Sequence, residues 1–163
     1  MSAVLKPAES LIRPMNEEDL EHVMAIEERA YEFPWSKQIF VDCLNVGYCC
    51  WVLEQNKQIV AYGVMTVAVG ESHVLNLCVS SDHRSQGLGK QLMQRLLEVA
   101  NDHGANMTFL EVRPSNFAAI SLYTGLGCNE VGIRSNYYPA KIGREDALVL
   151  ARTMTESEME ADE

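Results

Sequence analysis

The sequence predicts an α/β domain built on one mixed sheet. A strand, a glycine-containing turn and an amphipathic helix follow one another between Ser72 and Gly104, and another apolar strand follows at 107–112. Two β-rich segments separated by three residues precede this unit, which is the pattern of a hairpin. Two further strands close the chain. The expected order is β α α β β β α β α β β, and such interleaving places helices on both faces of the sheet.

The N-terminal part is expected to contain one strand, two helices and the hairpin. Leu11 to Pro14 forms a short strand that the proline closes. Asn16 is suited to cap the first helix and Ser36 the second, because these side chains accept hydrogen bonds from free helical N–H groups. The hairpin strands are expected at 48–54 and 58–67.

The central strand, turn and helix are expected at 73–79, at 80–90 and from there to His103. Apolar residues recur in this helix at three- and four-residue spacing, so they share one face. The members of this face are Leu88, Leu92, Met93, Leu96, Leu97 and Ala100. The unit from Val74 to Val112 has the length of a right-handed crossover, which makes its two strands parallel. We expect these strands to splay in a V beside the turn, so that a ligand enters where they part.

The C-terminal part is expected to contain one helix and two strands. Asn116 is suited to cap the helix, which glycines at 125 and 127 bring to an end. The closing strands are expected at 128–137 and 147–152, with a loop between them at 138–146.

Length and charge restrict the organisation and the partners of the protein. The 163 residues suit a single core, and we divide them into a flexible arm at 1–10, a domain at 11–154 and an acidic, disordered tail at 155–163. The formal charge of −10 disfavours direct binding of nucleic acid and favours basic proteins or amines. Since no stretch approaches the ~20 apolar residues of a membrane-spanning helix, we expect no membrane association.

The five cysteines form neither a CxxC pair nor a cluster with histidine. An odd number without such spacing argues against a disulfide framework and against a zinc site. We therefore expect no metal, and a reducing cytoplasmic location.

The turn before the central helix is a candidate phosphate site. Free N–H groups and the helix dipole attract anions to a helix N-terminus. Two known phosphate motifs fail on spacing, because Gly89-Lys90 is followed by Gln91 where a P-loop has Ser or Thr, and Leu92 stands where a dinucleotide fingerprint has its third glycine. The remaining pattern is Arg84-x-x-Gly87-x-Gly89, which an ordinary strand-to-helix turn would also satisfy.

Two side chains after this turn have the chemistry for proton transfer. Glu111 lies within an apolar strand, either as a base or as a surface partner of Arg113. A carboxylate base deprotonates an α-amino group, with an ordinary pKa near ~8, more easily than a lysine near ~10.4. Tyr123 lies in the last helix, either as a packed core residue or as the acid for a leaving thiolate.

Taken in order, these segments resemble the GCN5-related N-acetyltransferases (GNAT), and among them the RimI-type ribosomal-protein-alanine N-acetyltransferases, from about 11 to 153. Each stretch is short, and together they are specific. Besides the Arg84-x-x-Gly87-x-Gly89 pattern, the stretches are Glu32 to Ser36, Asn76 to Val79, Leu110 to Arg113, Ser115 to Asn116, Ala118 to Tyr123, Asn136 to Pro139 and Gly143 to Ala147.

The resemblance implies the acyl-CoA N-acyltransferase fold and an activity. Acetyl-CoA would be attacked directly by the N-terminal alanine amine of small-subunit ribosomal protein number eighteen, with Glu111 as general base and Tyr123 as general acid. The peptide entrance corresponds to Phe33, Pro34, Trp35, Tyr137 and Tyr138. The acetyl-CoA contacts correspond to Leu77, Cys78, Val79, Arg84, Ser85, Gln86, Gly87, Leu88, Gly89, Lys90 and Asn116.

Several alternatives stay open at this level. Trp35 and Tyr138 would also suit hydrophobic packing between loops, and Ser85 stands where the family often has a basic residue, which shifts phosphate binding toward Lys90. An irregularity at 77–79 would free backbone groups for the cofactor. The competing functions are a broader peptide N-terminal or lysine acetyltransferase and a non-catalytic acyl-CoA-binding module. The sequence does not decide the oligomeric state or the need for a partner protein.

Overall fold

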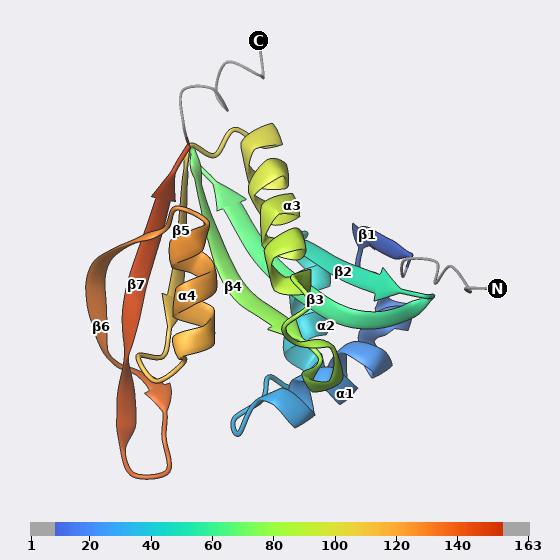
Figure 1. Cartoon of the computed structure of the whole chain (residues 1–163), viewed down its shortest axis with the longest axis horizontal. Helices are drawn as coiled ribbons and strands as arrows, with labels where there is room; N and C mark the ends of the chain where they lie inside the picture. The colour runs from blue at the N-terminus through green and yellow to red at the C-terminus, as the bar shows by residue number, and fades with distance from the viewer. Residues whose placement is uncertain (1–8, 155–163) are drawn as a thin grey trace, which may run out of the picture.

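The computed structural model describes residues 9–154, which form a seven-stranded mixed sheet with helices on both faces (Figure 1). The strand order is β1-β2-β3-β4-β5-β7-β6. The strands are β1 (Ser10–Pro14), β2 (Cys49–Gln55), β3 (Gln58–Ala68), β4 (Glu71–Val79), β5 (Met107–Val112), β6 (Asn129–Pro139) and β7 (Arg144–Thr153). The helices are α1 (Leu20–Ala30), α2 (Lys37–Asn45), α3 (Leu88–Asp102) and α4 (Phe117–Gly125).

Two short 3-10 helices, η1 (Glu17–Asp19) and η2 (Ser81–His83), precede α1 and α3. The expected order of strands and helices is confirmed. The arm and the acidic tail that the sequence predicts lie outside the described residues, except that β1 begins at Ser10, the last residue assigned to the arm.

The helix caps follow from local sequence. Ser36 caps α2, since its hydroxyl accepts a hydrogen bond from the N–H of Ile39 at 3.3 Å. Asn16 precedes the 3-10 turn η1 rather than α1 itself, and its N–H donates to the carboxylate of Asp19 at 2.8 Å. The first helix therefore starts three residues later than an uninterrupted α-helix capped by Asn16 would.

The central parallel strands separate halfway along β4. Their pairing runs from Glu71 opposite Met107 to Val74 opposite Leu110, and no later residue of β4 is paired with β5. Figure 1 shows the two strands side by side at one end and diverging toward the other. The predicted V-shaped splay is thus present in the described part of the sheet.

A β-bulge lies at the point of separation. On the other side of β4, Val64 pairs with Asn76 and Met65 with Val74, so Leu75 is the extra residue. A bulge bends its strand and increases the local twist. The irregularity therefore lies at Leu75, and 77–79, where the sequence analysis expected it, pairs in regular register with β3.

The two faces of the sheet bury separate cores. Leu110 and Val112 pack with α3 and with Tyr123 of α4. The other face, from β2 to β4, is covered by α1 and α2, which bury Leu20 and Phe40. Because side chains alternate along a strand, Glu111 of β5 points away from α3 and α4.

The last two strands extend further than the sequence predicts. The expected loop at 138–146 is wrong at both ends, because β6 continues to Pro139 and β7 begins at Arg144. An irregularity between Arg134 and Tyr138 interrupts the ladder, and pairing resumes with Tyr138 opposite Glu145. The guanidinium of Arg144 donates to the carbonyl of Asn136 at 2.7 Å, which stabilises the irregular segment.

An ion cluster ties β1 to α1 and β2. The guanidinium of Arg13 lies 2.8 Å from the carboxylate of Asp19 and 2.8 Å from that of Glu54. The hydrogen bonds from Arg13 lower the pKa of Asp19 below its ordinary value. Asp19 therefore stabilises the fold above its unfolded pKa, and this contribution is lost as the pH falls through the lower, folded pKa.

We predict that Asp19→Asn lowers the free energy of unfolding at neutral pH by roughly 1.5–3 kcal/mol, the range for hydrogen bonds to charged groups. The difference from wild type should shrink below about pH 4, where the unfolded carboxyl is protonated. Urea denaturation between neutral and acid pH measures both effects.

The control is Asp82→Asn, which removes an exposed pair with Arg29 at 3.5 Å. Its cost should stay within about 0.5 kcal/mol. A pH-independent deficit in Asp19→Asn, or an equal deficit in the control, would contradict the role of the cluster.

Candidate active site

The glycine turn leads directly into α3 on one side of the strand separation. Ser85 and Gly87 both have left-handed backbone, with φ of 64° and 76°, and Leu88 opens the helix. Residues 84–87 are exposed, whereas Leu88 is buried against β2 and β3 and fixes the helix start. The first N–H groups of α3 have no helical partners. The turn can therefore present them to a phosphate, together with positive charge from the helix dipole.

The charged side chains of the turn remain at its surface. The Nε of Arg84 donates to the carbonyl of Val79 at 3.4 Å, which holds the side chain beside the end of β4. Lys90 and Gln86 are exposed. At Gly89 an added Cβ would lie 3.3 Å from Leu122 of α4, so this glycine allows α3 and α4 to approach closely.

Cys78 lies on β4 beyond the point of separation and is buried. Burial raises the pKa of its thiol, although hydrogen bonds with Tyr62 and Tyr31 partly oppose this shift. The thiol is therefore protonated at neutral pH and is a poor nucleophile. This agrees with direct transfer to an amine rather than transfer through a cysteine.

Glu111 lies on the face of the sheet opposite α3 and α4 and is buried, with only 4% of its side chain exposed. Its Oε2 contacts Nε2 of His73 on β4, and its Oε1 lies 3.0 Å from Nε of Arg134 on β6. The alternative partner named from the sequence, Arg113, pairs with Glu145 at 2.8 Å instead. Glu111 thus belongs to a three-strand cluster and is no ordinary surface acid.

Tyr123 projects from α4 into the core on the opposite face and is buried. Burial raises its pKa well above the ordinary phenol value, with smaller contributions from Cys128, Tyr138 and Cys78. The hydroxyl is therefore protonated at neutral pH. Glu111 in turn helps to raise the pKa of Tyr138, so Tyr138 is an electrostatic neighbour of both candidate catalytic residues.

Asn116 caps α4, since its side-chain oxygen accepts from the N–H of Ala119 at 3.2 Å. The capping role is confirmed. Asn116 is also exposed, which leaves its amide available to a ligand.

The two loops predicted to frame the peptide entrance lie together. Lys141 of the β6–β7 turn and Glu32 of the α1–α2 loop are 4.0 Å apart, and both loops lie at the same end of the sheet (Figure 1). Phe33 and Tyr137 are exposed. Trp35 packs on the ring of Phe40 at 5.2 Å, so packing accounts for part of its role.

The ring of Tyr138 is held between two neighbours. It meets Tyr137 edge-on at 4.8 Å, and the guanidinium of Arg113 lies 4.4 Å from its centre. Cation–π contact of this kind fixes the ring position. The ring of Tyr138 is therefore fixed in place, while Tyr137 is exposed.

Sequence analysis missed a buried carboxylate, Glu27, that joins the entrance loop to β4. Its Oε1 accepts from the N–H of Trp35 at 3.1 Å, and its Oε2 accepts from the amide of Asn76 at 3.1 Å and from the hydroxyl of Tyr62. The sequence did contain a sign of this burial, because Glu27 stands on the apolar face of α1. The sequence does not show which groups donate hydrogen bonds to the carboxylate, so its position alone does not indicate a role.

Tyr31, His73 and Arg134 were also missed. The hydroxyl of Tyr31 lies 3.4 Å from the carbonyl of Leu77. Burial raises the pKa of Tyr31, and Cys78, Glu27 and Tyr123 add smaller contributions. Tyr31 directly precedes the predicted entrance stretch, so its position in the sequence could have marked it as a site residue. Nothing in the sequence marks His73 and Arg134, because only the strand order brings them to Glu111.

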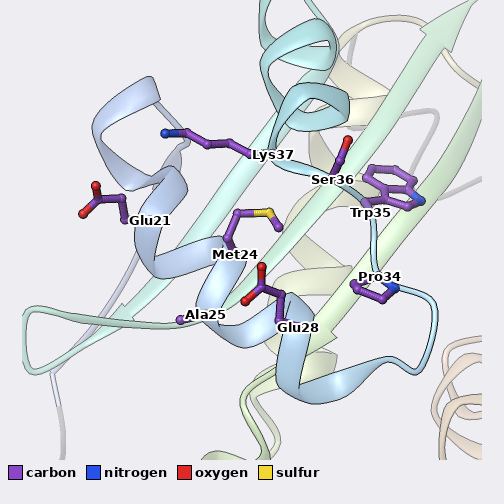
Figure 2. Close-up of a pocket in the computed structure, with 8 residues that line it drawn as sticks. All are labelled: Glu21, Met24, Ala25, Glu28, Pro34, Trp35, Ser36 and Lys37. Carbon is purple, nitrogen blue, oxygen red and sulfur yellow. The ribbon is translucent and has the colours of Figure 1, made fainter.

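A shallow hollow lies between α1 and the segment before α2 (Figure 2). Pro34 and Trp35 form one side of it, but none of the predicted catalytic or cofactor residues lines it. Its lining is Glu21, Met24, Ala25, Glu28, Pro34, Trp35, Ser36 and Lys37.

Within residues 9–154, no group of three or more His, Cys, Asp or Glu is arranged to hold a metal ion. None of the helices described there has the length and apolar character needed to cross a membrane.

Comparison with known proteins identifies the family. A model of the acetyltransferase (GNAT) family matches residues 13–128. The chain belongs to this family. It is 41% identical over 133 residues to the ribosomal protein bS18-alanine N-acetyltransferase of Escherichia coli K12, covering 82% of this chain and 90% of that protein. A putative bS18-alanine N-acetyltransferase of Bacillus subtilis is 32% identical over 147 residues, covering 89% and 96%.

Solved structures agree with this membership. The crystal structure of the ribosomal-protein-S18-alanine N-acetyltransferase from Escherichia coli matches with a TM-score of 0.83 at 38% identity, covering 90% of this chain and 95% of that one. The predicted GNAT fold, the RimI-type resemblance and the class of acetyl-CoA-dependent N-acetyltransferase are confirmed. A putative acetyltransferase from Salmonella typhimurium, solved with its cofactor acetyl-CoA, shares the fold, with a TM-score of 0.75 at 19% identity, covering 90% of this chain and 95% of that one.

The glycine turn before α3 can be tested for CoA binding with two matched glycine substitutions. Gly87 and Gly47 both have positive φ and open space around an added Cβ. We predict that alanine at either site costs about 1 kcal/mol of stability through backbone strain. Only Gly87→Ala should weaken CoA binding, by roughly 2- to 10-fold, the value of one misdirected hydrogen-bond donor. Calorimetric titration with CoA measures this, and equal CoA affinity in the two variants would contradict a phosphate site at the turn.

Proposed function

We propose that this protein transfers the acetyl group of acetyl-CoA to the N-terminal alanine amine of ribosomal protein bS18. The relatives that carry this name match over 90% or more of their own length, and the family resemblance noted in the sequence implies the same substrate. The observation that carries the proposal is the parting of β4 from β5, with Glu111 directed to one face and Tyr123 packed on the other.

The turn before α3 would hold the pyrophosphate of acetyl-CoA. Its exposed residues from Arg84 to Gly87 and the free N–H groups at Leu88 to Lys90 supply donors and positive charge. Beyond Val74, the edge of β4 facing β5 is released from the ladder, so Leu77 to Val79 can offer backbone groups to amides of the cofactor. Asn116, at the start of α4, would be a further contact for the cofactor.

Glu111 would take the proton of the incoming ammonium group. A carboxylate removes a proton from an α-amino group more readily than from a lysine, because their ordinary pKa values are about 8 and about 10.4. With Glu111 as the base, an N-terminal amine is therefore the easier acetyl acceptor to deprotonate. The neutral amine then attacks the thioester carbonyl directly, since the protonated thiol of Cys78 is unsuited to form a covalent intermediate.

Tyr123 would give its proton to the departing thiolate. Its raised pKa keeps the phenol protonated until the thiolate forms. The raised pKa makes the phenol of Tyr123 a weaker acid. A proton donor within hydrogen-bond reach of the leaving sulfur still assists its departure, so the position of the hydroxyl offsets its weaker acidity.

The entrance loops would select a flexible N-terminal segment. Phe33 and Tyr137 are exposed and Tyr138 is fixed beside Glu111. Acetylation of a ribosomal protein fits the cytoplasmic location predicted from the unpaired cysteines. The negative charge of the chain favours a basic substrate.

Two peptides distinguish the candidate activities. One begins with a free alanine and contains no lysine, and the other has a blocked N-terminus and a free lysine. Mass spectrometry after incubation with acetyl-CoA should show acetylation of the first alone. Acetylation of the lysine would favour the broader acetyltransferase, and CoA binding without any release of free CoA would favour the binding module.

We predict that Glu111→Gln lowers kcat/KM for the alanine peptide by about 10²- to 10⁴-fold, the usual value of a general base. Thiol release during steady-state turnover measures the rate. Glu98→Gln, which alters an exposed acid of α3, is the control and should retain the wild-type rate. A wild-type rate in Glu111→Gln would remove Glu111 from the mechanism.

We predict that Tyr123→Phe lowers kcat by a similar factor of about 10²–10⁴ and leaves the Kd of CoA unchanged, because only the acidic hydroxyl is lost. Single-turnover kinetics and calorimetry separate the two quantities. Tyr48→Phe alters an exposed tyrosine and serves as the control. Unchanged kcat, or a loss explained wholly by weaker CoA binding, would argue for a packing role.

A further inference from the structure

We propose that His73 is a positioning residue that fixes the carboxylate of Glu111 through a hydrogen bond from its imidazole. This inference rests on the proposed role of Glu111. It concerns a residue that lies on a different strand and is separated from Glu111 by 38 positions in the sequence.

The strand separation explains why these two side chains meet. His73 lies opposite Phe109 in the parallel ladder, one residue before β4 and β5 part. Glu111 lies one residue beyond the last paired position of β5, on the same face as Phe109. His73 is therefore the last residue of this face that the ladder still holds beside β5, and its Nε2 contacts Oε2 of Glu111.

The other oxygen of Glu111 is available for chemistry. Oε1 is buried and accepts no hydrogen bond from any described residue. Arg134 lies 3.0 Å from it but outside hydrogen-bond geometry. A buried carboxylate oxygen without a donor is costly. The N–H of an incoming amine would supply the missing donor, so Oε1 is the oxygen that takes the proton.

Histidine suits the positioning role because its ring N–H is a donor on a short, flat side chain. Nε2–H of His73 donates to Oε2 of Glu111, which fixes the orientation of the carboxylate and leaves Oε1 open. Arg134 adds a fixed positive charge near Oε1.

Two protons leave the substrate nitrogen in the whole reaction. The first N–H bond of the ammonium breaks and an O–H bond forms at Oε1 of Glu111, while the hydrogen bond from Nε2 of His73 to Oε2 stays in place. The second N–H proton leaves as the tetrahedral adduct collapses and, through water, replaces the proton that Tyr123 gives to the thiolate. Glu111 releases its proton to water after the products depart.

The test compares His73→Met with His73→Gln in the full-length protein, using acetyl-CoA and the alanine peptide. The methionine variant removes the donor, and we expect kcat to fall by about 10- to 100-fold, the range of one hydrogen bond to a charged group. The glutamine variant keeps a donor that does not titrate. It should recover most of kcat, because its side-chain amide can still donate a hydrogen bond to Glu111.

His22→Gln, at an exposed position of α1, is the control and should keep the wild-type kcat. Wild-type kcat in His73→Met, or a kcat in His73→Gln as low as in His73→Met, would overturn the proposal. Should His73→Met fail to fold, His73→Gln alone decides: a kcat close to wild type supports the proposal, and a fall of the size expected for methionine contradicts it. Failure of the proposed function is distinguishable, because wild type itself would then release no CoA with the alanine peptide, or Glu111→Gln would be as active as wild type.

Discussion

The separation of β4 from β5 after Val74 and Leu110 is the constraint on which the rest of the molecule depends. A closed ladder would leave no backbone donors or acceptors for a ligand and would bury both central strands. The bulge at Leu75 bends β4 at the same point, and α3 and α4 cover only one face of the opening. Consequently a cofactor can lie against the turn before α3 while an amine approaches Glu111 from the other face.

Buried charge then connects the opening to the loops around it. Glu27 is almost fully buried, and such a carboxylate is tolerated only when hydrogen bonds satisfy it. Its donors are the backbone of Trp35 and the side chains of Asn76 and Tyr62. The entrance loop is thereby attached to the bulged segment of β4. The same principle applies to Glu111, which has His73 on one oxygen and, within residues 9–154, no hydrogen-bond donor on the other.

Much of this architecture followed from local sequence. Apolar spacing located α3, side-chain oxygens located the caps at Ser36 and Asn116, and the length of the crossover implied that β4 and β5 are parallel. Long-range contacts did not follow, because spacing along the chain says nothing about which strands become neighbours. His73 and Arg134 reach Glu111 only because the strands are ordered β4-β5-β7-β6. The loop predicted at 138–146 is shorter in the structure, and this depends on hydrogen bonds from Arg144 of β7 to the backbone of β6.

The central claim is that the opening between β4 and β5 brings acetyl-CoA and an N-terminal amine together at Glu111. The most direct measurement is a crystal structure with a bisubstrate ligand in which CoA is joined to the N-terminus of an alanine peptide. We predict that its phosphates contact the N–H groups at the start of α3 and that the alanine nitrogen lies within hydrogen-bond distance of Glu111 Oε1. A ligand bound away from the opening, or an alanine nitrogen held by a different carboxylate, would contradict the account.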